Sequence, residues 1–501
     1  MKHTIRIFAK ALIALTIFGT TELSGISITI VPTYEQNGGV FPVEIQGQGN
    51  QPGVNNDELV VTGEATLLNT PTVVVTSNDG AFFIGGSYTI LTSGLLVGDF
   101  SPLVTTNNAL TGHPLHITPV LKYVGNNVLL DFRPGFLAVA KNLNEFHVVE
   151  QLESISDPTS DQAILLNNIT SLTGIEIQQA LEEMSGSQYA QINNMIELSN
   201  HQFIRRLYDP LRPFLTTGPC SYLSCNCEDE IDFWVDASGL TSRVFNTQSA
   251  YGFKNNGYEV GLGAQIIPDP YWIFGAAVNY EYGKIDYNIE GDGEINTLLG
   301  AFYGAYRDVD FYVVGDLVMG GSSGRVNRSF NIGPVLYSEK GNPKSFQGAL
   351  YVEGGMNFLC DGVIFQPFVG FEFGYYHPHK LRESGSDPVA LNFSISSYGT
   401  IDSRLGLHFT SPFPDSGFSF ALDLAWVSRL NDLQDHRIVR FFDFGKAFRS
   451  YGSNVRRNSF DGSINLTQII NDQWSLYATG SGEFWSKSCA YDLTGGISFS
   501  W

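Results

Sequence analysis

The sequence has few basic residues: its 501 residues include 28 Lys and Arg against 50 Asp and Glu, for a formal net charge of −22. An acidic surface repels phosphate, which argues against nucleic-acid binding. Beyond residues 1–25 no stretch approaches 18 apolar residues, so no transmembrane helix is expected. Cysteine is scarce too, and its odd count in an exported chain leaves at least one thiol free or paired between chains. The five cysteines are Cys220, Cys225, Cys227, Cys360 and Cys489.

Residues 1–25 have the layout of a secretory signal peptide. Lys2, Arg6 and Lys10 come first, the apolar run 11–18 follows, and small or polar residues complete the segment. The apolar run is too short to cross a bilayer and matches the middle region of an export signal. Export without a helical anchor leaves two classes, a soluble secreted protein and a membrane β-barrel.

Glycine and aromatic residues are abundant, with 53 Gly, 36 Phe and 23 Tyr, which favours an all-β protein. In residues 491–501 apolar and polar side chains alternate strictly, and this predicts a strand with one apolar and one wet face. Several such segments reach the length of about nine to eleven residues that crosses a bilayer. We place twelve of them at 231–244, 256–267, 271–286, 295–306, 309–326, 346–359, 363–376, 393–410, 417–430, 456–469, 473–486 and 489–501.

The connections between these segments alternate in length. Those after the even-numbered strands are short, as at 268–270 and at Asp361-Gly362, whereas those after the odd-numbered strands are longer, up to the stretch 431–455. Outer-membrane barrels have short turns on the periplasmic side and long loops outside. An even number of strands therefore puts both ends of the barrel on the periplasmic side.

Two other kinds of pattern precede the strands. Short β segments separated by Gly, Pro and Asn fill residues 26–135, which fits a β-sandwich or a parallel β-solenoid, although no strict repeat is visible. Helices are expected at 143–155 and 161–172. The longest helical pattern is 175–213, and we expect this helix to lie inside the barrel.

Four segments carry a family resemblance: SYTILTSGLLVGDFS (87–101), PVLKYVGNNVLLDF (119–132), LEEMSGSQYAQI (181–192) and FIRRLYDPLR (203–212). The first two are similar to the last coils of a passenger domain in the autotransporter (type V secretion) outer-membrane proteins. The other two resemble the linker before the barrel of that family, with Ser187 where a Glu is common. Twelve strands after a helix, ending on an aromatic residue, also resemble the family's C-terminal β-barrel domain.

The resemblance implies an all-β fold, in which a 12-stranded antiparallel transmembrane β-barrel holds a helix in its lumen and follows a short β-solenoid-like passenger and a helical linker. The expected domains are the signal peptide (1–25), the passenger (26–135), the linker with the pore helix (136–213) and the barrel (214–501). The protein would lie in the bacterial outer membrane with its passenger at the cell surface. The barrel would translocate and display this passenger, for adhesion or only as a folding cap.

The family also implies partners. The barrel would contact outer-membrane lipid, and barrel-assembly machinery and periplasmic chaperones would insert it. The C-terminal GISFSW, with Phe499 and Trp501, resembles the insertion signal. A host or cell-surface ligand is an expected partner of the passenger, whereas no nucleic acid, cofactor or metal is expected.

The lumen is predicted to be rich in acids, because ten carboxylates fall on the polar face of their strands and would point inward in a closed barrel. Arg205, Arg206 and Arg212 on the lumenal helix would face them. We hypothesise ion pairs between the two sets; the alternative is a solvated lumen without specific pairs. The acids are Asp232, Asp236, Glu259, Glu281, Asp316, Glu353, Glu372, Asp423, Glu483 and Asp492.

Two further features have alternative interpretations. The pair Asn193 and Asn194 is a weak candidate for self-cleavage by asparagine cyclisation, as some autotransporters release their passenger in this way; ordinary surface polarity is the alternative. The thiols of Cys220, Cys225 and Cys227 would lie on the oxidising periplasmic side, where a disulfide is favoured. Inert thiols and metal binding are the other readings of these cysteines.

No enzyme is expected. Residues 320–324 match the G-x-S-x-G pattern, but they fall in a predicted strand and not at the strand-to-helix turn that a nucleophile needs. Two classes compete with the autotransporter interpretation: an outer-membrane porin-like channel with a periplasmic N-terminal domain, and a soluble secreted enzyme.

Overall fold

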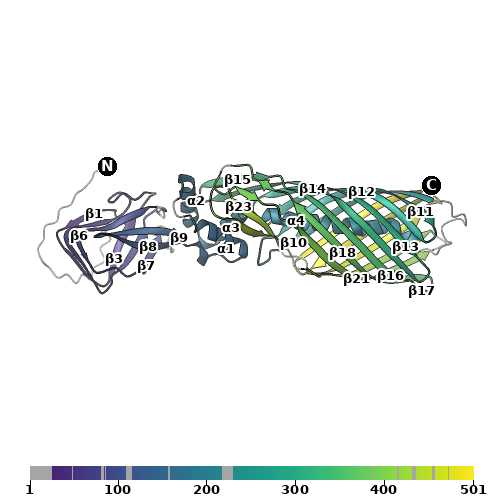
Figure 1. Cartoon of the computed structure of the whole chain (residues 1–501), viewed down its shortest axis with the longest axis horizontal. Helices are drawn as coiled ribbons and strands as arrows, with labels where there is room; N and C mark the ends of the chain where they lie inside the picture. Colours follow the sequence, from purple (N-terminus) through teal and green to yellow (C-terminus); the bar gives the residue numbers. More distant parts are fainter. Residues whose placement is uncertain are drawn as a thin grey trace. The chain divides into compact units, whose positions relative to one another are not determined.

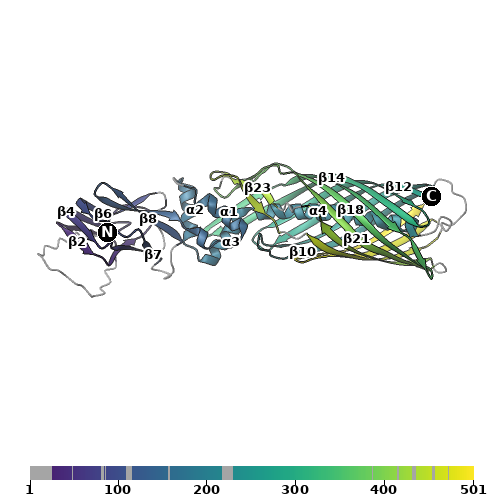
Figure 2. The same ribbon diagram turned by 60° about the horizontal axis from the view of Figure 1, so that its bottom comes forward.

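The computed structural model falls into two compact units, of which the first comprises Met1–Ala140, Val149–Gln178 and Ile332–Val335 and the second the remainder. Figures 1 and 2 show the elements of each. Residues 1–24 of the predicted signal peptide and the candidate disulfide residues Cys220, Cys225 and Cys227 lie outside the described residues. The structure describes residues 25–47, 49–79, 84, 86–108, 116–155, 158–216, 230–385, 387–413, 417–431, 436–453, 457–471 and 473–501.

Parallel strands build the N-terminal unit. Strand β4 pairs in parallel with β1, β2 and β6, and a second sheet has the parallel order β3-β5-β7. The strands are β1 (Ile28–Val31), β2 (Tyr34–Asn37), β3 (Val40–Ile45), β4 (Glu58–Leu68), β5 (Thr72–Ser77), β6 (Ser87–Val97) and β7 (Val104–Asn108).

The strands stack as coils of nearly constant length. Paired residues are 30 positions apart between 28 and 58, 32 between 59 and 91, and 31 between 73 and 104. Val61, Ala65, Val73 and Val75 are at most 1% exposed and fill the space inside the coils. Strands β1–β7 therefore form a parallel β-solenoid, and of the two folds expected for this segment they do not form the sandwich.

An antiparallel hairpin ends the solenoid. Strand β9 (Asn127–Pro134) pairs antiparallel with both β6 and β8 (Ile117–Val124). Because its direction is reversed, the hairpin stops the addition of further parallel coils at this end of the sheet.

Four helices follow, and the third and fourth meet at Gly186. This residue has a φ of +70°, and a Cβ there would lie 2.4 Å from Leu391 Cδ1, so only glycine fits. No helix within the described residues has the length and hydropathy to cross a bilayer. The helices are α1 (Leu143–Leu152), α2 (Ser160–Thr170), α3 (Gly174–Ser185) and α4 (Ser187–Thr216).

Twelve antiparallel strands of the described residues form a closed barrel, since β10 pairs with β27 and β13 with β14. The predicted number of strands and the alternation of their faces are confirmed. The barrel strands are β10 (Glu230–Val244), β11 (Phe253–Asp269), β12 (Trp272–Tyr287), β13 (Asp292–Arg307), β14 (Phe311–Ile332), β16 (Lys344–Met356), β18 (Val363–Pro378), β21 (Tyr398–Phe413), β22 (Phe418–Arg429), β25 (Asn458–Ile469), β26 (Trp474–Trp485) and β27 (Ser488–Ser500).

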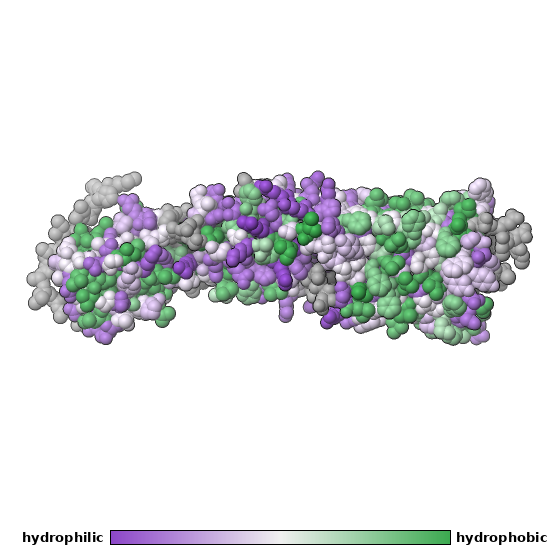
Figure 3. All heavy atoms as spheres, viewed as in Figure 1, coloured by the Kyte–Doolittle hydropathy of each residue, from purple (hydrophilic) through white to green (hydrophobic). Residues whose placement is uncertain are grey.

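The outer face of the barrel is apolar. Side chains such as Leu262, Phe302, Val369 and Leu405 are 49–67% exposed on it. Figure 3 shows hydrophobic residues gathered over these strands, whereas hydrophilic residues gather around β15 and β23. An exposed apolar band of this kind is the surface that a barrel presents to lipid.

The long loops contain strands that the sequence did not predict. Two of these loops form one four-stranded sheet, and the strand predicted at 393–410 is divided: residues 391–393 belong to the loop sheet and the barrel strand begins at Tyr398. The loop strands are β15 (Val335–Gly341), β19 (Leu381–Arg382), β20 (Leu391–Phe393), β23 (His436–Phe441) and β24 (Phe448–Tyr451), and β17 (Phe358–Cys360) extends β16 at the short-turn end.

Candidate functional site

Helix α4 fills the lumen of the barrel. Its apolar side chains pack against aromatic and aliphatic residues of the wall, and Phe203, Leu207 and Leu211 are fully buried there. The wall residues of this cluster are Trp234, Ile273, Ala277, Leu299, Ala301, Tyr303, Ala305, Tyr312, Val314, Val318, Ala349, Tyr351, Phe368 and Ala425.

Glycines in the wall make room for the lumenal rings. A Cβ at Gly263 would lie 2.5 Å from the Trp234 ring, and one at Gly275 would lie 2.2 Å from the Tyr303 ring. The Trp234 indole N–H in turn donates to the Tyr303 hydroxyl at 2.8 Å. Part of the high glycine content thus serves the close approach of aromatic rings to neighbouring strands.

The helix enters the lumen from the long-loop end. Near its start, the Gln191 side chain donates to the Tyr251 carbonyl at 2.7 Å, in the loop between β10 and β11. Near its end, the Arg307 guanidinium donates to the Phe214 carbonyl and lies 4.3 Å from the centre of the Phe214 ring. Arg307 ends β13 at a short turn, so the helix leaves the barrel where the connections are short.

Each of the three helix arginines contacts at least one of the predicted acids. Arg206 donates to Asp236 and Glu259, and it also donates to the Asn279 side chain at 3.1 Å. The Arg206 side chain is 6% exposed and both carboxylates are 1% exposed. A guanidinium between two desolvated carboxylates offsets the repulsion between them.

Arg212 and Arg205 each bind one acid of the wall, and Arg212 also lies 3.7 Å from Asp209 of its own helix. Arg212 makes a bidentate pair with Asp423 at 3.0 and 2.7 Å, and Arg205 donates to Asp492 at 3.1 Å. Asp423 also accepts from His408 at 2.7 Å. The His408 ring is stacked between Tyr208 and Phe368 at 4.3 Å from each, which fixes its orientation.

The other predicted acids have different surroundings. Ser199 donates to Glu281, and the Tyr312 hydroxyl donates to Glu353 at 2.8 Å. Gln265 donates to Asp232 at 3.2 Å. Asp316 lines a cavity beside α4 together with Arg205 and Arg212, and its Oδ1 is buried without a hydrogen-bond partner.

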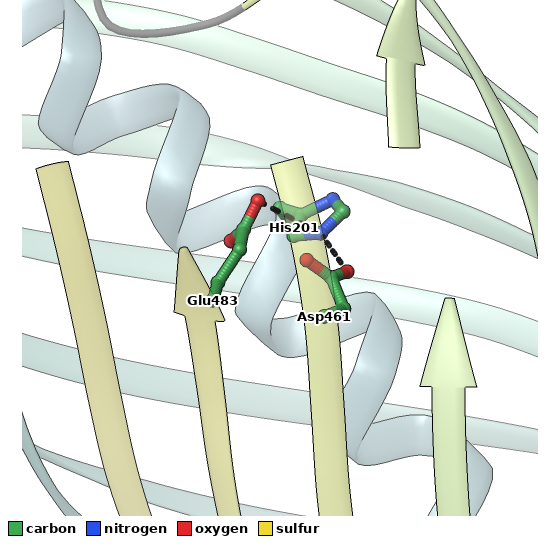
Figure 4. Close-up of side chains that lie close together, drawn as sticks. All are labelled: His201, Asp461 and Glu483. Atoms are coloured by element: carbon green, nitrogen blue, oxygen red, sulfur yellow. Dashed lines mark hydrogen bonds and ion pairs between the residues drawn. The ribbon is translucent and has the colours of Figure 1, made fainter. Parts of the chain in front are cut away.

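The last two predicted acids, Glu372 and Glu483, lie around His201. The Nδ1 of His201 is 2.8 Å from Glu372. Its Nε2 is 3.2 Å from Asp461 and 3.6 Å from Glu483, as Figure 4 shows for these two acids. His201 was missed in the sequence, although it precedes Arg205 by four residues and therefore shares its helix face.

Two further groups were missed. Arg429 bridges Asp402 and Glu197 of α4, with its Nη2 at 3.0 and 3.1 Å from the two carboxylates. Asp209 of α4 accepts from Thr479 at 2.8 Å. The alternation of each strand would have identified Asp402 and Asp461 as inward residues, as it did the other acids.

The self-cleavage candidates lie near the start of α4. Asn193 is 2% exposed and its amide atoms have no hydrogen-bond partner, while Asn194 donates to Gln191 and to the Ser453 carbonyl. Within the described residues neither side chain is hydrogen-bonded to a carboxylate. The geometry therefore provides no acid in contact with the asparagine pair, and self-cleavage stays a prediction.

The remaining candidates lie at the short-turn end or on the wall. Cys360 is exposed and Cys489 is partly exposed, both as free thiols. Phe499 packs on Trp474 with ring centres 4.7 Å apart. The Trp501 N–H donates to the Ile231 carbonyl at 2.9 Å, so the last residue extends the seam between β27 and β10.

Helix α3 ends in a buried polar junction with Arg328, near the end of β14. Arg328 makes a bidentate pair with Glu383 at 2.6 Å, both side chains 0% exposed, and it donates to the Glu183 carbonyl at 2.6 Å. Burial raises the pKa of Glu182 to about 7 and that of Glu183 to about 8. Ser187, Asn142 and Asn144 donate to Glu182 and limit its rise.

Comparison with known proteins agrees with this architecture. Residues 233–481 match the family described as the autotransporter beta-domain. Two proteins from Serratia marcescens, both named extracellular serine protease, are 22% and 21% identical over 493 residues; these matches cover 87% of this chain and 46% of each relative. The chain thus spans about half the length of these curated relatives.

Two solved structures are also similar. The translocator domain of the autotransporter NalP from Neisseria meningitidis shares 11% identity at a TM-score of 0.48, over 60% of this chain and 97% of that one. The beta domain of the Bordetella autotransporter Brka shares 18% identity at a TM-score of 0.40, over 54% of this chain and 99% of that one.

A closed barrel of twelve strands with a lipid-facing apolar surface and a helix in its lumen defines an outer-membrane secretion domain. Through the match of residues 233–481, the chain belongs to the autotransporter family. Its barrel is an outer-membrane domain that secretes a passenger and exposes it at the cell surface. This domain is a translocator and not an enzyme.

The helix arginines give a first prediction. Replacing Arg206 by Gln leaves Asp236 and Glu259 buried side by side without their cation, and removal of one partner from a buried pair costs about 3–5 kcal/mol. We expect the purified barrel to unfold at a lower temperature, measured by its heat-dependent migration on a denaturing gel, and its pore conductance to rise.

The matched control is Lys284→Gln. Lys284 lies 3.8 Å from Asp286 in an exposed pair, so its loss is expected to change stability by less than about 1 kcal/mol. Identical unfolding temperatures and conductance for both variants would mean that the lumen is solvated and that the Arg206 pairs are unimportant.

A second prediction concerns pH. A carboxyl whose pKa is raised by folding stabilises the folded state below the pKa of the unfolded chain, and that contribution is lost as pH rises through the folded value. As the pH rises from about 5 to about 8, we therefore expect the junction at Glu182 and Glu183 to open more often. Amide hydrogen exchange at the end of α3, corrected for intrinsic rates, should then be faster at pH 8 than at pH 5. In the variant with both residues replaced by Gln this acceleration should be absent; the same acceleration in it would refute the assignment.

Proposed function

We propose that the barrel translocates its own N-terminal β-solenoid and keeps it displayed on the cell surface as an adhesive module. The proposed domains are the signal peptide 1–25, the passenger 26–135, the helical linker and tether 136–213 and the barrel 214–501. The observation that carries the proposal is α4, which runs through the lumen from the long-loop end of the barrel to its short-turn end.

The contacts of α4 support retention of the passenger. Arg206 pairs with carboxylates on β10 and β11, and Arg212 pairs with a carboxylate on β22. Phe203 and Leu207 pack against the wall. Extraction of the helix would break several buried ion pairs and expose a large apolar surface. A tether held in this way keeps the passenger attached unless the chain is cut.

The same helix disfavours the alternative of a porin-like channel with a periplasmic N-terminal domain. A conducting pore needs a polar, water-filled lumen. Here aromatic rings and a helix occupy the lumen, so free diffusion of solutes would require the helix to leave.

Adhesion is proposed from the surface of the solenoid. Large apolar side chains are exposed on the parallel strands β1 and β6, which flank β4, among them Ile30 at 62% and Leu95 at 49%. Exposed apolar patches on soluble domains mark interaction sites. The others on β1, β4 and β6 are Ile28, Leu68 and Val97. The serine protease activity in the names of the Serratia marcescens relatives belongs to those longer proteins, and we do not extend it to this chain.

Insertion is proposed to follow the family. Phe499 and Trp501 lie at the end of the chain, in and directly after β27. Before β27 pairs with β10 and closes the barrel, its free edge would be available to barrel-assembly machinery. Before that step, periplasmic chaperones would bind the apolar faces of the unfolded barrel strands.

The display proposal predicts the outcome of protease treatment. Protease added to intact cells that express the full chain should remove the solenoid and leave a protected barrel fragment that contains α4. The solenoid should fractionate with the cells and not with the medium. Survival of the solenoid on intact cells, with digestion only after the outer membrane is permeabilised, would place it in the periplasm and favour the porin-like alternative.

The adhesion proposal is tested with one substitution on the patch. Ile30→Asp puts a charge in the apolar patch, and we expect the retention of expressing cells on polystyrene to fall several-fold. Thr29→Asp is the matched control, since Thr29 is the exposed neighbour on the same strand and points to its other face. Equal retention of both variants, at equal surface display, would remove the patch as the adhesive site.

A further inference from the structure

One cluster in the lumen joins α4 to two neighbouring strands. His201 comes from the helix, Asp461 from β25 and Glu483 from β26, and the two acids are paired directly opposite each other in the sheet. Figure 4 shows both carboxylates turned toward the imidazole ring. All three residues are at most 3% exposed.

The distances in this cluster fit a shared metal ion. The His201 Nε2 atom is 3.2 Å from Asp461 Oδ2 and 3.6 Å from Glu483 Oε1, and one donor atom of each residue lies within 4.8 Å of the others. Ligands about 2.0–2.1 Å from a tetrahedral zinc ion are about 3.3 Å from one another. An ion could thus sit between the donors with only small side-chain shifts.

The other ring nitrogen has the partner that a metal-binding histidine needs. His201 Nδ1 lies 2.8 Å from Glu372 Oε2. Metal-ligating histidines usually donate their second N–H to a carboxylate, which fixes the tautomer and raises the basicity of the ligating nitrogen. In that tautomer the Nε2 lone pair points toward Asp461 and Glu483.

Two independent observations favour a cation at this position. Asp461 is 3% exposed, yet its Oδ1 has no hydrogen-bond partner. Three carboxylates, those of Asp461, Glu483 and Glu372, surround His201. Arg404, 2.9 Å from Asp461, and the charge of Arg205 offset part of their negative charge, and a divalent ion would offset more of it than a proton on His201 would.

Small cavities adjoin the cluster. Asp461 lines the cavity beside α4, and His201 and Glu483 line a second one together with Ser459 and Asp402.

We propose that His201, Asp461 and Glu483 bind one divalent transition-metal ion of the zinc class, with Glu372 orienting His201. One imidazole and two carboxylates form a mixed nitrogen and oxygen set that suits zinc and its neighbours in the first transition row. A bound ion would link the helix to β25 and β26 and so add a tie between tether and barrel wall that does not depend on the arginine pairs.

The test is a metal titration of the full chain, purified in detergent without a polyhistidine tag and stripped with a chelator. Cobalt(II) serves as the probe, because its visible absorption reports a mixed-donor site, and zinc should displace it. We expect one cobalt per chain. His201→Gln and Asp461→Asn should abolish this absorption, and Glu372→Gln should weaken binding about 10–100-fold.

The control variant is Asp492→Asn, which removes another lumenal acid that pairs with Arg205 and should leave the stoichiometry at one. Each variant is first shown to be folded by its heat-dependent gel migration. If the wild-type chain binds less than one cobalt ion tightly, that result alone overturns the proposal. Equal binding by wild type and Asp461→Asn overturns it as well, since the ion would then lie elsewhere in the chain.

Discussion

Charge burial inside the barrel is the constraint on which the other features of the second unit depend. The strands turn their carboxylates inward because the outer face must be apolar for lipid, and this gathers acids in a space with little water. Such a lumen is stable only if cations reach the acids. Helix α4 supplies three of them, and Arg404 and Arg429 of the wall supply others. The register of Arg206 against Asp236 and Glu259 and of Arg212 against Asp423 fixes the height and rotation of the helix.

The same helix carries the apolar half of the arrangement. Its rings and aliphatic side chains meet Trp234, Tyr303 and Phe368 of the wall, so the lumen is packed like the interior of a soluble domain. Glycines on the adjacent strands let these rings lie flat. A barrel of this kind resembles a folded core with lipid outside it more than an empty channel, and the helix is its central core element.

Local patterns could be predicted from the sequence and long-range pairings could not. Alternation of period two is a local property, so it identified the twelve strands and the inward acids such as Asp236 and Glu259. The loop strands β20 and β23 were missed because each is short and finds its partner in a different loop. A solenoid was expected as one of two folds, but its repeat was not visible in the sequence, because stacking equates positions such as 28 and 58 without requiring the same residue at both.

His201 shows how far the candidate site could be predicted from the sequence. A single histidine on a helix has no period to distinguish it, and its partners Asp461 and Glu483 lie more than 250 positions further along the chain. Only closure of the barrel brings the three together. Arg205, Arg206 and Arg212 could be assigned a role earlier, because any cation on a helix inside an acidic lumen has acids on every side.

The solenoid has a consequence for how such surface modules vary. Each coil takes about 31 residues, and its strands must fall in line with those of the coils above and below. Insertions or deletions of a few residues would misalign the stack, whereas the loss or gain of a whole coil would keep it intact. The length of the solenoid along its stacking direction is therefore quantised, since it changes in steps of one strand spacing, about 4.8 Å.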